Sequence, residues 1–90
     1  MQEVSAVPDL AAVGVTSFGE SFVLLDQQGD ILMPTMLYTD PRGEAEADFL
    51  SERLGEDNIN TIAGTAPHPM YSLPKLMWVR NHKPEIFAKI

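Results

Sequence analysis

Apolar residues in the first half of the chain form short runs separated by glycine and polar residues. The runs are AAVGVT at 11–16, SFVLLD at 21–26 and ILM at 31–33. Short runs rich in β-branched and aromatic residues predict strands, and the DQQGD segment at 26–30 predicts a tight turn in which Gly29 takes a positive φ. Pro34 limits how far the returning strand can pair. We therefore expect a β-meander of about three strands over residues 11–37.

The second half of the chain, from residue 41 to 90, has apolar residues at helical spacing and the start and stop residues of three or four helices. Asp40 suits the N-cap of the first helix, Pro41 its first helical position and Gly55 its C-terminal end. The other helices are expected over residues 57–63 and 72–81 and from Pro84 onward. A meander followed by helices predicts an α/β fold.

The predicted strands are unusually apolar for a sheet with open edges. A sheet of about three strands leaves two edges unpaired, and these runs are too apolar to face water on both sides. A chain of 90 residues also buries only about 60–65% of its unfolded surface. We therefore expect further polypeptide to cover the sheet, or self-association through the exposed sheet by strand exchange.

Composition excludes several classes of partner and chemistry. The net charge of −7 makes nucleic acids and anionic membranes poor partners. There is no cysteine, and His68 and His82 lack the spacing of a zinc site, so we expect no metal ligands. The N-terminus does not read as a signal peptide, and no apolar run approaches the roughly 20 residues that cross a membrane, which predicts a cytoplasmic location.

Two short segments carry polar groups where a ligand could bind. Glu20 follows Gly19 between two predicted strands, and ligands gather at strand ends in α/β proteins. On the residues alone, a solvated loop carboxylate is the favoured alternative. Tyr38, Asp40 and Arg42 alternate, so an aromatic ring and two charged groups could meet a ligand. On the residues alone, the favoured alternative is a core tyrosine, a helix cap at Asp40, and Arg42 paired with that cap or with a nearby glutamate.

A third segment is the proline-bounded loop before the helix expected at 72–81. Met70 in this loop could line a pocket, although methionine is also an ordinary core residue. Lys75 falls in the first turn of the helix, where the helix dipole disfavours a cation, and this indicates a specific partner. No phosphate-binding glycine loop, nucleophile elbow or catalytic triad is present. The residues alone are also compatible with a complete, non-catalytic acidic module that binds a protein partner.

Four sequence elements, in order and with matching gaps, resemble one stretch of the FGGY carbohydrate kinases, the group that includes xylulokinase, glycerol kinase and gluconokinase. They are GVTSFGES at 14–21, VLLDQQGDILMP at 23–34, YTDPRG at 38–43 and AGTAPHPMYSLPKLMW at 63–78. The resemblance covers about residues 13–90. It implies that residues 1–90 are a fragment of the N-terminal, sugar-binding domain of an ATP-dependent kinase that phosphorylates a hydroxyl of a sugar or polyol. The implied fold is part of a ribonuclease H-like, actin-type ATPase domain.

The resemblance also implies a set of substrate-binding residues, which are Gly19, Glu20, Tyr38, Asp40, Arg42 and Met70. Glu20 matches a residue that contacts substrate hydroxyls, and Tyr38 matches the usual tryptophan of the W-x-D-x-R element. Asp40 and Arg42 match the charged pair of that element, whose role the resemblance leaves mostly architectural. Gly19 stands where other members carry a large contact side chain, so a glycerol substrate is not expected and the sugar stays open.

The same resemblance implies that the catalytic and nucleotide-binding residues lie outside residues 1–90. It implies a phosphate-binding D-x-G-T/S element before Met1, and a catalytic aspartate and an adenosine-binding segment beyond Ile90. We therefore expect ATP and Mg2+ to serve the longer enzyme, with no catalytic residue and no cofactor bound by this segment alone. The expected partners are the sugar and the remaining kinase chain. A kinase relic kept for sugar sensing is a third possibility, and it would bind sugar without ATP.

Overall fold

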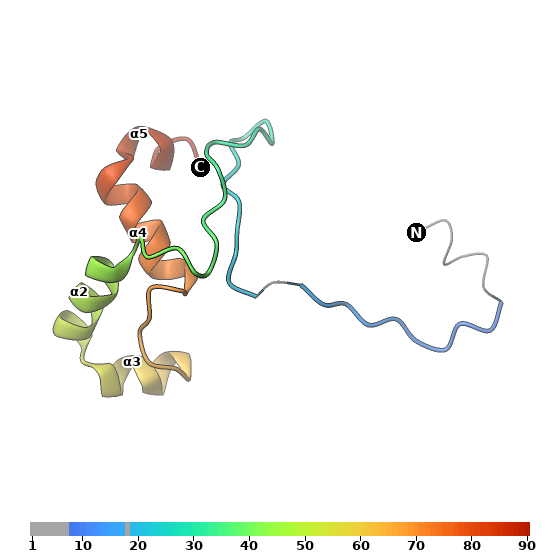
Figure 1. Ribbon diagram of the computed structural model, residues 1–90, viewed down its shortest axis with the longest axis horizontal. Coiled ribbons are helices and arrows are strands. Elements are labelled where there is room, and N and C mark those ends of the chain that lie inside the picture. The colour runs from blue at the N-terminus through green and yellow to red at the C-terminus, as the bar shows by residue number, and fades with distance from the viewer. Residues whose placement is uncertain (1–7, 18) are drawn as a thin grey trace.

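The computed structural model describes residues 8–17 and 19–90. Figure 1 shows the helices gathered at one end of the molecule, with the extended N-terminal part of the chain projecting away from them. The labelled helices are α2 (Glu44–Leu54), α3 (Glu56–Ala63), α4 (Ser72–His82) and α5 (Pro84–Phe87). The expected series of helices in the second half of the chain is confirmed. Within the described ranges, none of the helices has the length and apolar character needed to span a bilayer.

The hairpin expected around residues 26–30 is present. The N–H of Asp26 donates to the carbonyl of Asp30 at 3.0 Å, and the Asp26 carboxylate accepts the N–H of Gln28 at 2.9 Å. Gly29 has φ 83°, as the turn signal predicted. Beyond the turn, the two arms meet in isolated antiparallel bridges, Phe22 with Met36 and Leu25 with Ile31.

The predicted three-stranded meander over residues 11–37 is not confirmed. Residues 10–17 are exposed and pair with no strand among the described residues, and Val15 is 94% exposed. A β-branched run forms a strand only where a neighbour completes its hydrogen-bond ladder, and the hairpin does not reach this segment. Self-association through an exposed sheet is therefore not supported, because the described part of the chain holds bridges rather than a sheet.

A small apolar core joins the hairpin to the helices. Leu24 and Met36 of the hairpin and Val79 of α4 are buried together. Partly buried residues pack around them, namely Phe22, Leu32, Met33, Leu76, Trp78 and Ile86. The radius of gyration is 17.7 Å, whereas a compact domain of this length has about 12 Å. Large apolar side chains remain exposed, among them Val15, Ile31 and Ile62.

Helices α2 and α4 lie side by side, and their first turns start differently from the sequence-based expectation (Figure 1). Asp40 is not the N-cap of α2. Gly43 holds that position with φ 105°, and α2 begins at Glu44. The Asp40 carboxylate is engaged by Arg42 instead, so it is not available to the first turn of the helix. At α4, Ser72 has the residue type of an N-cap but is the first helical residue, and Tyr71 holds the cap position.

Candidate functional site

Asp40 and Arg42 form a hydrogen-bonded ion pair just after the hairpin arm. Asp40 Oδ1 accepts the backbone N–H of Arg42 at 2.9 Å and its Nε–H at 3.0 Å, while Asp40 Oδ2 accepts the Arg42 Nη2–H at 2.6 Å. Nε also lies 3.1 Å from Oδ2, so its single N–H is shared between the two oxygens. Three N–H groups of Arg42 thus take up most of the roughly four acceptor positions of the carboxylate. The pair is therefore suited to holding the loop in shape more than to binding a ligand hydroxyl through Asp40.

The guanidinium of Arg42 connects this loop to α4. Its central carbon lies 5.1 Å from the centroid of the Trp78 ring, a cation–π distance. The Trp78 ring is in turn stacked on His82, with centroids 4.7 Å apart and an interplanar angle of 15°. The loop at 38–43 is thus fixed against one face of α4, and the expected ion pair of Arg42 with Asp40 is confirmed.

An open hollow of about 410 Å³ lies between this loop and the proline-bounded loop before α4, and we call it the loop hollow. Three predicted site residues, Tyr38, Asp40 and Met70, line it. The remaining lining residues are Thr39, Pro41, Glu44, His68 and Pro69. Tyr38 is 47% exposed, so its ring is a free wall of the hollow and not the core residue that the alternative interpretation required.

Sequence reasoning missed the polar lining residues Glu44 and His68. His68 Nδ1 accepts the backbone N–H of Met70 at 3.1 Å, so in the neutral ring the proton lies on Nε2. Nε2–H is then free to donate, and the Glu44 carboxylate can accept. Glu44, the first residue of α2, and His68, in the loop before α4, each lie within four positions of a predicted site residue, and this closeness was the available signal.

Gly19 and Glu20 are not among the residues that line the loop hollow. They form a turn before the hairpin, Gly19 is exposed, and a Cβ built at Gly19 would meet nothing within 4 Å. Arg42 also lies outside the lining set, because it faces Trp78. The structure therefore brings together three of the six predicted residues directly and a fourth, Arg42, through its bonds to Asp40.

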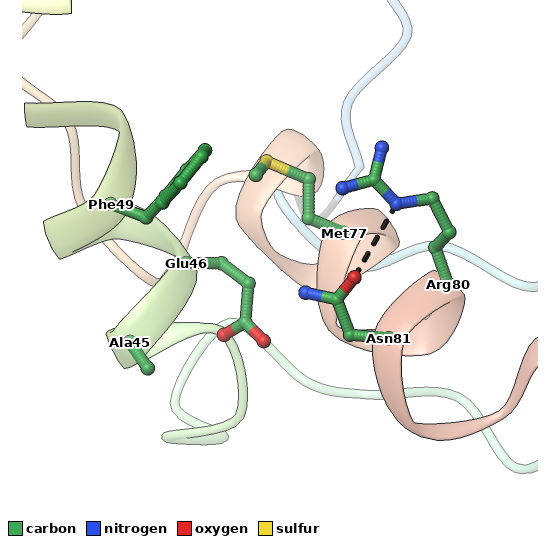
Figure 2. Close-up of a pocket in the computed structure, with 6 residues that line it drawn as sticks. All are labelled: Ala45, Glu46, Phe49, Met77, Arg80 and Asn81. Atoms are coloured by element: carbon green, nitrogen blue, oxygen red, sulfur yellow. Dashed lines mark hydrogen bonds between the residues drawn. The ribbon is translucent and has the colours of Figure 1, made fainter. Parts of the chain in front are cut away.

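A second hollow, of about 360 Å³, opens between α2 and α4. Figure 2 shows its lining residues, which are Ala45, Glu46, Phe49, Met77, Arg80 and Asn81. Glu46 is buried, its Oε1 lies 3.8 Å from His82 Nδ1, and its Oε2 has no hydrogen-bond partner. None of the predicted substrate-binding residues lines this second hollow, so it serves as a natural control for the first.

No three histidine, aspartate or glutamate side chains converge to hold a metal ion anywhere in residues 8–17 and 19–90. We derive no step through a metal ion from these residues.

The Asp40–Arg42 pair predicts a pH dependence of stability. Hydrogen bonding from the Arg42 side chain, the largest cause, lowers the pKa of Asp40 from 3.8 to about 2. Because the folded-state pKa is the lower one, the stabilisation is complete above pH 4 and is lost as the pH falls through 3.8 toward 2. Both side chains are partly solvated, so the contribution is on the order of 1 kcal/mol.

Urea unfolding followed by the fluorescence of Trp78, the single tryptophan, measures this effect. We expect Asp40→Asn to lower the urea midpoint at pH 6 and to remove part of its fall between pH 4 and pH 2. Asp48→Asn, on an exposed position of α2, is the matched control. Identical pH profiles for Asp40→Asn and the unmodified chain would show that the pair does not stabilise the fold.

Comparison with known proteins matches this chain to one protein family. A family model described as the N-terminal domain of the FGGY family of carbohydrate kinases matches residues 2–90. The xylulose kinase of Escherichia coli K12 is 34% identical over 85 residues, covering 94% of this chain and 17% of the relative. The L-fuculokinase of the same strain is 26% identical over 80 residues, covering 89% of this chain and 17% of the relative.

A solved structure agrees with the sequence relatives. The crystal structure of a xyloylose kinase from Brucella ovis superposes with a TM-score of 0.72 at 32% identity, covering 81% of this chain and 14% of that protein. The chain thus spans about one sixth of the length of the curated relatives that it matches.

Proposed function

The chain belongs to the FGGY family of carbohydrate kinases, N-terminal domain, and on this basis we propose that it is part of a longer ATP-dependent kinase that phosphorylates a hydroxyl of a sugar or polyol. Relatives named as kinases of different sugars match the same segment. The proposal therefore commits to the reaction class and to a carbohydrate acceptor, and not to one sugar.

The loop hollow is the observation that carries the proposal for this segment. Two loops that the sequence resemblance implicates, 38–43 and 65–71, face each other across it, although 21 residues separate them in the chain. A half-exposed tyrosine ring can pack on the C–H face of a sugar, and Nε2–H of His68 and the carboxylate of Glu44 can meet its hydroxyls. We propose the loop hollow as one wall of the sugar site.

Roles within this wall follow from the contacts of each residue. Tyr38 and Met70 provide the apolar surface, while Asp40 and Arg42 hold the loop in shape. Glu20 and Gly19 remain proposed contacts that would approach the sugar from a different side, since the turn at 19–20 does not line the hollow. When bound elsewhere in the longer enzyme, ATP and its Mg2+ supply the phosphoryl group, and this segment orients the acceptor.

Filling the loop hollow tests the proposed sugar site. In the longer enzyme, we expect Met70→Trp to raise KM for the sugar by about tenfold or more, because the indole occupies the acceptor's space. KM for ATP should not change. Met77→Trp is the matched control, since it places the same ring in the hollow between α2 and α4. Turnover is measured as ADP release with xylulose, fuculose, gluconate and glycerol offered separately.

Two outcomes would contradict the proposal at different levels. An unchanged sugar KM in Met70→Trp, with full turnover, would remove the loop hollow from the sugar site. No sugar-dependent ADP release by the unmodified longer enzyme would remove the kinase function itself and favour the acidic protein-interaction module.

A further inference from the structure

Lys75 is a fully buried cation at the junction of the two loops. It lies in the first turns of α4 with 0% of its surface exposed, and its side chain points back toward the start of the helix. Its ammonium donates to the carbonyl of Asp40 at 2.7 Å, to that of Pro69 at 2.6 Å and to that of Arg42 at 3.3 Å. Two of these carbonyls belong to the first loop of the hollow and one to the second.

The ammonium is fully satisfied by these three contacts. An ammonium has three N–H donors, and here each donor has one backbone carbonyl. Burial lowers the pKa of Lys75, while the nearby Asp40 carboxylate acts in the opposite direction. A cation in this position works against the helix dipole, so the three carbonyls explain a residue that the sequence alone marked as out of place.

Within the described part of the chain, Lys75 is the only group that joins these two loops by hydrogen bonds. Asp40 and Arg42 bond to each other, and the hydroxyl groups of Thr65 and Tyr71 meet within the second loop at 2.8 Å. Each loop is thus braced internally, whereas the carbonyls of Asp40 and Pro69 are held on a common donor. The Lys75 ammonium thus links the two loops that line the loop hollow.

We propose that Lys75 is a positioning residue of the sugar site, which fixes the separation of the 38–43 and 65–71 loops and thereby the width of the loop hollow. The expected effect on catalysis rests on the proposed function. The expected effect on the separation of the two loops does not depend on any sugar. Lys75 does not line the hollow, so it acts through Asp40 and Pro69 and not by contact with the acceptor.

The first test is kinetic and uses the longer enzyme. Lys75→Met keeps the length of the side chain and removes all three donors, so the loops lose their common anchor. We expect KM for the sugar to rise roughly 10- to 100-fold, with KM for ATP unchanged. Lys83→Met, at an exposed lysine just after the same helix, is the control and should leave both KM values unchanged.

Kinetics separate positioning from a merely structural role. If Lys75 only stabilises the fold, Lys75→Met lowers the amount of active enzyme and hence the maximal rate, while the sugar KM of the surviving molecules stays normal, and that result would overturn the proposal. Lys75→Arg covers the possibility that Lys75→Met does not fold. The larger guanidinium keeps the charge but cannot fit the same three carbonyls, so we expect a raised sugar KM there as well.

A second measurement does not depend on sugar turnover. Hydrogen exchange of Lys75→Met, or of Lys75→Arg if the first does not fold, should be faster in both loops at 38–43 and 65–71. Exchange in α3 should match that of Lys83→Met. Faster exchange in both loops supports the positioning role even if no sugar is turned over, in which case only the proposed function fails. Unchanged exchange in the two loops would overturn the positioning role even if the kinase is active.

Discussion

Replacing Gly43 by alanine should destabilise the fold by about 2–4 kcal/mol, the largest stability loss that we expect from a single methyl group in this chain. Gly43 has φ 105°, a conformation that L-residues rarely adopt. A Cβ there would also lie 3.1 Å from the carbonyl carbon of Pro74 and 3.2 Å from the nitrogen of Lys75. These are backbone atoms of α4, which cannot turn away as a flexible side chain would.

Gly64→Ala is the matched control for this substitution. Gly64 also has a positive φ, 77°, but a Cβ built there meets nothing within 4 Å. Gly64→Ala should therefore lower the free energy of unfolding only through backbone strain, by about 1–2 kcal/mol. Urea unfolding followed by Trp78 fluorescence compares the two variants, and Trp78 lies on the helix that Gly43 approaches. Equal losses would show that the close approach of the 38–43 loop to α4 adds nothing to stability.

The 90-residue chain by itself should show no sugar-dependent ATP turnover, whereas the proposed longer enzyme should turn over at roughly 1–100 per second. Phosphoryl transfer requires the acceptor, the donor and the metal ion to be held in line. In our proposal the described residues form one wall of an acceptor site, and they include no cluster of three or more metal-binding side chains. Positioning of one substrate alone cannot lower the barrier of a two-substrate reaction.

ADP release by both proteins, at equal molar concentration and with the same set of sugars, measures this difference. The longer enzyme with Met70→Trp provides an internal comparison, because it retains all other parts of the machinery. Sugar-dependent ADP release by the purified 90-residue chain would contradict the prediction and would place catalytic groups within this segment.

Helical structure was the part of the fold that could be predicted best. The end of α2 at Gly55, the end of α3 at Gly64 and the start of α5 at Pro84 agree with the expected bounds. These signals are local, because a glycine with positive φ or a proline at the first helical position acts on its own backbone. The same holds for the hairpin turn with Gly29.

The meander and the role of Asp40 could not be predicted in this way. Residues 11–16 have the composition of a strand, but a strand requires a partner ladder, and the described residues do not supply one. Asp40 has the right type and place for a helix cap, yet Arg42 engages its carboxylate through side-chain and backbone donors. Competition between two partners for one carboxylate is decided by geometry that a sequence pattern does not contain.

The sequence by itself determined the local elements of this protein, the acidic and cysteine-free chemistry and, through four ordered motifs, its family. Only the tertiary structure decided which side chains meet. It placed Tyr38 and Met70 on one hollow, left Glu20 outside it, and gave Lys75 three carbonyl partners up to 35 residues away. The physical reason is that turns and caps depend on neighbours in sequence, whereas a hollow and a buried ammonium depend on the distance between segments that the chain itself does not constrain.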